Sequence, residues 1–131
     1  MSYDQALKRI AEAAETNATE LDLSGLELTE VPAEIGQLTQ LETLFLGKVT
    51  KWELVNNIPV PTLVTNKITN LPAELTTLKN LKKLDLSGNP VAKITDEVLH
   101  VQTLVDLRLV STGLTEIPDS LAQLSNLTQL S

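Results

Sequence analysis

A near-identical segment recurs along this chain, and such internal repetition restricts the folds that it can adopt. Three copies are present, at residues 28–35, 68–75 and 114–121, each with apolar residues flanking a central proline. Each copy follows a Leu-x-Leu element, and the units repeat every 23 residues except across one interval of 40. The surplus of 17 residues is the segment 49–65. The sequence therefore predicts stacked repeats with one insertion in the second unit.

The chemistry of one unit indicates its local structure. Side chains alternate along a strand, so the two leucines of Leu-x-Leu share one face. The following proline lacks a backbone donor and turns the chain into a short helical or irregular return. One unit cannot bury its apolar side alone, but stacked units build a continuous core. The composition agrees, because 26 of the 131 residues are leucine and only three are aromatic, Tyr3, Phe45 and Trp52.

The consensus LxxLxLxxNxLxxLPxxIxxL, which covers nearly everything after Ala18, resembles the leucine-rich-repeat family in its 23-residue bacterial form. The resemblance implies an α/β solenoid with a parallel sheet on its concave side. Residues 18–26 and the early insertion are similar to the N-terminal repeats of bacterial Roco-type proteins, in which a GTPase domain follows. In the family, the Asn of the consensus satisfies backbone groups of neighbouring turns. Since Leu26 and Thr112 replace it in two units, we expect interruptions there.

We interpret residues 1–131 as a single domain with a cap helix at 1–17, repeats at 18–130 and the insertion at 49–65. Residues 3–15 have helical periodicity, and the predicted apolar stripe consists of Tyr3, Leu7, Ile10, Ala11 and Ala14. This helix is expected to cover the open end of the first repeat. No such cap follows the fifth unit, which favours a fragment of a longer repeat protein over self-association through that end or a frayed tail.

Two extended stretches around Asn56-Asn57 predict that the insertion is a β-hairpin, because Asn tolerates the positive φ of a tight turn. Pro59 and Pro61 point their ring nitrogens to one edge, which must then be solvent-exposed or irregular. The insertion begins just after the second concave strand, beside the concave surface. Two alternatives remain for its packing: it leaves Phe45 exposed as a binding residue, or it folds back so that Trp52, Leu54 or Val60 covers Phe45.

Several classes of function are disfavoured. The net charge of −7 without a basic run argues against nucleic acid, and the lack of cysteine excludes disulfides and thiolate metal sites. No signal peptide and no apolar run of the roughly 20 residues needed to span a bilayer is present. We therefore expect a cytoplasmic protein that binds no membrane and no cofactor. Gly47-Lys48 does not complete a phosphate-binding loop, and His100 is interpreted as a surface residue of an outer return.

The repeat register places Asp22, Phe45, Asp85 and Arg108 at the centres of successive concave strands. We interpret Asp22 and Asp85 as solvated sheet residues rather than a catalytic pair. Aromatic and Arg side chains are typical binding anchors. The candidate partner-binding residues are Phe45, Trp52, Lys83, Asp85, Asp106 and Arg108.

The predicted function is non-enzymatic binding of a protein partner through the concave face and the insertion. The alternative is a regulatory segment of a larger Roco-type GTPase. If the insertion covers Phe45, the exposed site moves to Lys83, Asp85, Asp106 and Arg108.

Overall fold

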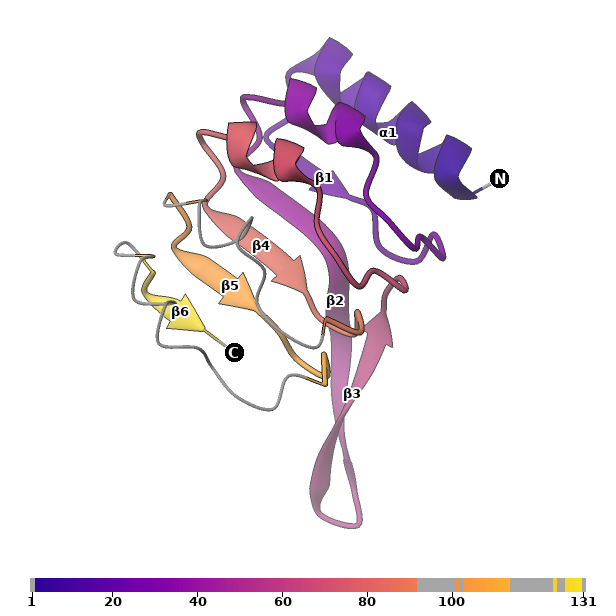
Figure 1. Cartoon of the computed structure of the whole chain (residues 1–131). Coiled ribbons are helices and arrows are strands. Elements are labelled where there is room, and N and C mark those ends of the chain that lie inside the picture. The colour runs from indigo at the N-terminus through magenta and orange to yellow at the C-terminus, as the bar shows by residue number, and fades with distance from the viewer. Residues whose placement is uncertain (1, 92–100, 102, 114–123, 125–126, 131) are drawn as a thin grey trace.

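Parallel strands lie side by side in one sheet (Figure 1) in the computed structural model, which describes residues 2–91, 101, 103–113, 124 and 127–130. The parallel strands, in their order across the sheet, are β1 (Glu20–Asp22), β2 (Thr43–Val55), β4 (Lys83–Leu86), β5 (Asp106–Arg108) and β6 (Gln129–Leu130). The first leucine of each Leu-x-Leu pairs with its counterpart in the next strand, from Leu21 to Leu44, Leu84 and Leu107. This pairing confirms the predicted repeat register.

Short 3-10 helices form the returns between strands. Helix η1 (Ala33–Gln37) begins after Pro32, and η2 (Ala73–Thr77) begins after Pro72. Both run along the side of the sheet away from the hairpin (Figure 1) and contact each other. Leucines of the strands and apolar residues of the returns form one buried core between these two layers. The predicted solenoid, with the sheet on one side and the returns on the other, is therefore confirmed.

The N-terminal helix α1 (Ser2–Thr16) lies over the first repeat, where it contacts η1 and β1. Its buried face consists of Ala6, Ile10 and Ala13, so of the predicted stripe only Ile10 is buried and Leu7 is half-buried. Ala11 and Ala14 are exposed, and Tyr3 is at the edge of the contact with 39% of its surface accessible. Alanine fits a buried face as well as an exposed one, so periodicity alone could not distinguish the two stripes.

Two buried asparagines tie the turns together. Asn66 accepts hydrogen bonds from the N–H groups of Leu26 and Leu28. It donates to the carbonyl groups of Leu23, directly after β1, and Leu46 of β2. Asn89 repeats this role one turn later by accepting from the Ile68 N–H. Leu26 makes no such side-chain bond and depends on Asn66 of the next turn, as the interruption of the consensus predicts.

Strand β2 continues beyond the sheet and pairs with antiparallel β3 (Ile58–Val64) in a hairpin that projects from the body (Figure 1). Asn56 and Asn57 form the turn with φ values of 53° and 66°, so the predicted hairpin is confirmed. In the described residues β3 pairs only with β2, which leaves Pro59 and Pro61 in an outer strand.

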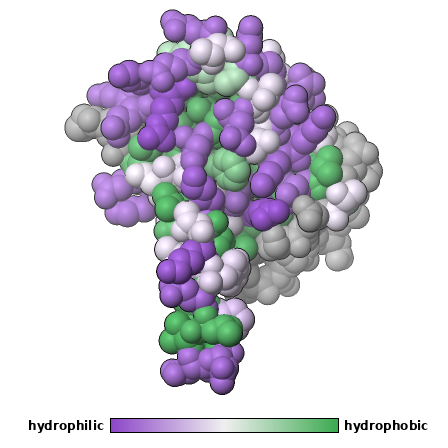
Figure 2. Space-filling view, turned by 180° about the vertical axis from the view of Figure 1, so that it is seen from behind, coloured by the Kyte–Doolittle hydropathy of each residue, from purple (hydrophilic) through white to green (hydrophobic). Residues whose placement is uncertain are grey.

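The hairpin does not fold back over Phe45. Leu54 and Val60 are 71% and 41% exposed, and the hydrophobic side chains near the free end of the hairpin are visible in Figure 2. The covering alternative is therefore wrong for these two residues.

Some predicted features lie outside the described residues, namely the third copy of the repeated segment, at 114–121, and His100. Among the helices that the structure describes, none has the length and apolar character that a bilayer crossing requires.

Candidate functional site

The concave side of the sheet presents the residues that stand between the two leucines of each Leu-x-Leu. Strand pairing places Asp22 beside Phe45, Phe45 beside Asp85, and Asp85 beside Arg108. Two residues earlier, on the same face, Lys83 pairs with Asp106. This row follows from the repeat spacing, because equal register steps stack equivalent positions in adjacent strands.

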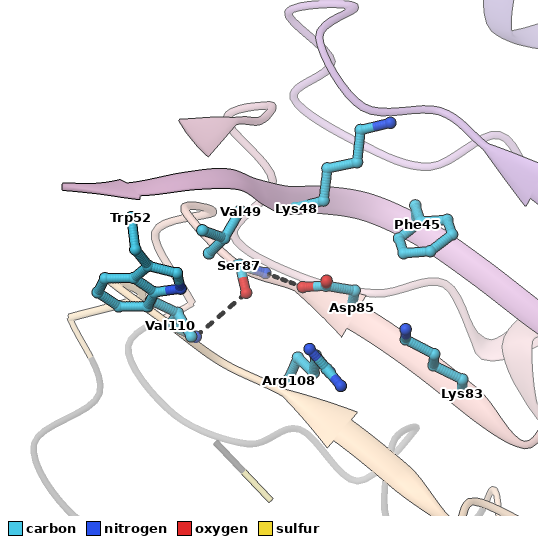
Figure 3. Close-up of a pocket in the computed structure, with 9 residues that line it drawn as sticks. All are labelled: Phe45, Lys48, Val49, Trp52, Lys83, Asp85, Ser87, Arg108 and Val110. Atoms are coloured by element: carbon cyan, nitrogen blue, oxygen red, sulfur yellow. Dashed lines mark hydrogen bonds between the residues drawn. The ribbon is translucent and has the colours of Figure 1, made fainter. Parts of the chain in front are cut away.

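A cavity of about 420 Å³ lies at the foot of the hairpin on this face (Figure 3). Its walls come from β2, β4 and β5, from the residue directly after β4 and from the second residue after β5. It is lined by Phe45, Lys48, Val49, Trp52, Lys83, Asp85, Ser87, Arg108 and Val110. The structure thus brings together five of the six candidate residues. The sixth, Asp106, lies outside the lining and forms an ion pair of 3.3 Å with Arg108.

Phe45 forms the aromatic wall of the cavity and is half-buried. The Nζ atoms of Lys83 and Lys48 lie 5.0 and 5.8 Å from the centre of its ring. At these distances both ammonium groups interact favourably with the electron-rich ring face. Trp52 lines the cavity from the hairpin and keeps 57% of its surface exposed. The two aromatic residues therefore belong to the same site.

Asp85 is not the solvated sheet residue that the sequence indicated, because only 4% of its surface is accessible. Its Oδ1 accepts the backbone N–H of Ser87 at 3.0 Å. The Ser87 hydroxyl in turn accepts the N–H of Val110 at 3.2 Å, which fixes the cavity floor to the next strand. Its neighbours in the flanking strands are Phe45 and Arg108, and a periodicity argument does not include how these side chains pack. Asp22, in the outermost strand, remains half-buried.

Four lining residues were absent from the sequence-based candidates: Lys48, Val49, Ser87 and Val110. Val49 and Trp52 are three positions apart, so regular alternation would point them to opposite faces. A register shift between Val49 and Lys51 adds one residue to β2, and this brings Trp52 back to the cavity side. The repeat pattern contains a signal only for Ser87 and Val110, which directly follow the second apolar position of their strands.

Asp22 carries the second ion pair of this face. Its Oδ2 lies 2.5 Å from Lys48 Nζ, and its Oδ1 accepts the Ser24 N–H at 2.9 Å and the Ser24 hydroxyl. Partial burial raises the pKa of this carboxyl, but the hydrogen bonds from Lys48 and Ser24 outweigh it, so the pKa is lower than usual. The pair connects β1 to the base of the hairpin.

We expect Asp22 to make stability depend on pH in the acid range. A carboxyl with a lowered folded-state pKa stabilises the fold above its unfolded pKa of about 3.9 and loses this contribution as the pH falls through the folded-state value. Asp22→Asn should therefore be less stable than the unaltered chain at pH 6, by no more than about 1 kcal/mol since the pair is partly exposed. Urea unfolding at a series of pH values should show this gap narrowing as the pH falls below the unfolded pKa of about 3.9. A gap that stays constant over this series would contradict the assignment, and Glu20→Gln, in the same strand, is the control.

The described residues contain no group of three or more His, Cys, Asp or Glu placed to hold a metal ion.

Comparison with known proteins identifies the repeat. Residues 80–100 match the Leucine Rich Repeat family. Over 51 residues the chain is 49% identical to the mouse leucine-rich repeat and IQ domain-containing protein 4, a match that covers 38% of this chain and 9% of that protein.

Two solved structures share the fold. Internalin C2 of Listeria monocytogenes matches with a TM-score of 0.68 and 27% identity over 95% of this chain and 52% of that one. A leucine-rich-repeat protein of Leptospira interrogans matches with a TM-score of 0.54 and 34% identity over 78% of this chain and 28% of that one. The chain thus spans about half or less of the length of each relative.

Proposed function

We propose that this chain, which folds as a leucine-rich-repeat solenoid, is a non-enzymatic module that binds a protein partner through its concave face and its β2–β3 hairpin. The leucine-rich-repeat architecture generally serves protein–protein interaction. The observation that carries the proposal is the cavity in which Phe45, Trp52 and Arg108 converge. Aromatic and Arg side chains dominate the binding energy of protein interfaces when they are clustered in this way.

The hairpin enlarges this surface. Trp52 pairs with Pro61 and Leu54 pairs with Pro59, and residues directly opposite each other in an antiparallel pair share a face. One face of the hairpin is therefore apolar and continues outward from the cavity, where Trp52 is located. The opposite face carries the ion pair of Lys51 and Glu53. Exposed apolar surface of this kind, bordered by charged residues, is typical of protein-binding sites.

The prolines of β3 disfavour a partner that adds a strand to the edge of the hairpin. They favour a partner that contacts the side chains on its face. A partner strand would need backbone donors along the outer edge of β3, and Pro59 and Pro61 have none. The partner is therefore expected to contact the apolar face of the hairpin rather than its edge.

The proposal is tested by partner capture with variants matched in side-chain type. The double variant Phe45→Ala/Trp52→Ala is compared with Tyr3→Ala, which removes an exposed aromatic residue from the cap helix. Arg108→Ala is compared with Lys79→Ala, which removes an exposed cation outside the cavity. Proteins that the immobilised chain retains from a lysate of its source are quantified for each variant by mass spectrometry.

We expect the concave-face variants to retain about tenfold less partner or worse, because each removes an interface anchor, while both controls retain as much as the unaltered chain. Circular dichroism confirms that each variant is folded. Equal retention by all variants contradicts the proposed surface, and so does equal loss in the controls.

The Roco-type alternative stays a prediction, since none of the relatives described above bears on it. The same holds for a cytoplasmic location and for self-association through the last repeat.

A further inference from the structure

One oxygen of the buried Asp85 carboxylate has no partner within the described residues. Oδ1 accepts the Ser87 N–H, whereas no donor there reaches Oδ2. Asp22, at the equivalent position of β1, differs because Lys48 and Ser24 serve both of its oxygens. A buried carboxylate oxygen without a hydrogen bond is costly, and such groups are satisfied in nearly all native proteins. Asp85 lines the cavity (Figure 3), so a bound partner can reach it.

The apolar part of the cavity lining favours a bound group whose larger portion is also apolar. Phe45, Val49, Trp52 and Val110 supply aromatic and aliphatic surface around the floor formed by Asp85 and Ser87. A volume of about 420 Å³ accommodates one large side chain. The entering group therefore combines an apolar body with a hydrogen-bond donor at its tip.

Charge restricts the donor further. Lys48, Lys83 and Arg108 line the cavity, and Lys83 forms no ion pair in the part of the chain that the structure describes. A partner ammonium or guanidinium group would enter among like charges, and a carboxylate would meet Asp85 where little water screens the repulsion. A neutral donor avoids both penalties. Among protein side chains, Tyr and Trp combine a neutral donor with a large apolar body.

We propose that the cavity holds a Tyr or Trp side chain of the protein partner, whose hydroxyl or indole N–H donates to Asp85 Oδ2 while its ring packs between Phe45 and Trp52. This inference rests on the proposed function and specifies the partner residue that the site recognises. The ring also lies within reach of Lys83, whose ammonium group is already positioned over an aromatic face.

Side-chain analogues test the proposal without a known partner. The full chain, labelled with ¹⁵N, is titrated with p-cresol, which reproduces the Tyr side chain, and with 4-methylanisole, in which a methyl group replaces the donated hydrogen. The chain contains one Trp, so the single indole N–H resonance reports directly on Trp52. The backbone amides of Ser87 and Val110 report on the floor. n-Butylammonium and butyrate serve as the charged probes.

We expect p-cresol to bind about tenfold more tightly than 4-methylanisole, since a hydrogen bond to a charged acceptor distinguishes the two probes. Both charged probes should bind more weakly than p-cresol. In Asp85→Asn the preference for p-cresol should disappear, because the carboxylate charge is lost while the acceptor for the Ser87 N–H is kept. Phe45→Leu, which leaves Asp85 in place, should weaken both aromatic probes and keep their ratio.

Equal binding of p-cresol and 4-methylanisole, tighter binding of a charged probe, or no shift at Trp52 overturns the proposal. These outcomes are separable from the proposed function. If partner capture depends on Phe45 and Trp52 but p-cresol is not preferred, the proposed binding face is supported and the proposed Tyr or Trp anchor is refuted. If p-cresol is preferred but all variants capture the partner equally, the cavity does bind an aromatic side chain but has no role in binding the partner.

Discussion

Asn66→Ala is expected to lower the free energy of unfolding by about 3–5 kcal/mol, because the change leaves buried backbone groups without their hydrogen-bond partner. Only 3% of the Asn66 surface is accessible. Its side chain accepts from the N–H groups of Leu26 and Leu28 at 3.0 and 3.1 Å and donates to the carbonyl oxygens of Leu23 and Leu46, both at 2.8 Å. Alanine leaves all four groups without this partner. Urea unfolding monitored by circular dichroism measures the difference.

Two further variants identify the cause. Asn80→Ala removes an exposed side chain that makes a single bond of 3.0 Å to the Thr39 carbonyl, so its cost should stay below about 1 kcal/mol. Asn66→Asp keeps the shape and the acceptor but turns a carboxylate oxygen toward two carbonyl groups, and it should be at least as damaging as alanine. A loss below 1 kcal/mol for Asn66→Ala would contradict the structural role of this residue.

Asn66 also illustrates how far the sequence predicts this fold. The insertion separates Asn66 from Leu46 in the chain, yet its side chain still bonds to the Leu46 carbonyl, as the consensus position requires. Strand register and the row of Asp22, Phe45, Asp85 and Arg108 were predictable for the same reason, because they depend on spacing that repeats from unit to unit. The turn at Asn56-Asn57 lies in the insertion and was predictable from the tolerance of Asn for positive φ.

The details of the site could not be predicted because they depend on contacts between units. The register shift near Lys51 places Trp52 on the cavity side, and no residue type marks it in the sequence. Asp85 is buried in a strand that is flanked on both sides, by β2 and β5, and the pairing of Lys48 with Asp22 depends on the path of β2 beyond the sheet. These features are set by packing, which alternation and repeat spacing do not encode.

Gly47→Ala is expected to cost about 2–4 kcal/mol and to distort the cavity, because β2 lies against the next turn at this glycine and leaves no room for a side chain. A Cβ atom there would lie 1.9 Å from the Ser87 carbonyl oxygen and 3.0 Å from Asn89 Nδ2 and Thr65 Oγ1. The carbonyl is backbone and cannot rotate away. Gly47 pairs with Leu86 where the register with β4 shifts, just before the hairpin begins, so relief of the clash must move β2 away from β4.

The matched control for Gly47 is Gly113→Ala. Gly113 has a φ of 79° with nothing within 4 Å of an added Cβ, so its cost is conformational alone, about 1 kcal/mol. Unfolding in urea should therefore rank Gly47→Ala as the more destabilised variant. The Trp52 indole resonance should also shift in folded Gly47→Ala and stay unchanged in Gly113→Ala, since only the first substitution lies beside the floor residue Ser87. Equal costs for the two variants, or an unmoved Trp52 signal in Gly47→Ala, would mean that the base of the hairpin tolerates a wider spacing than the structure indicates.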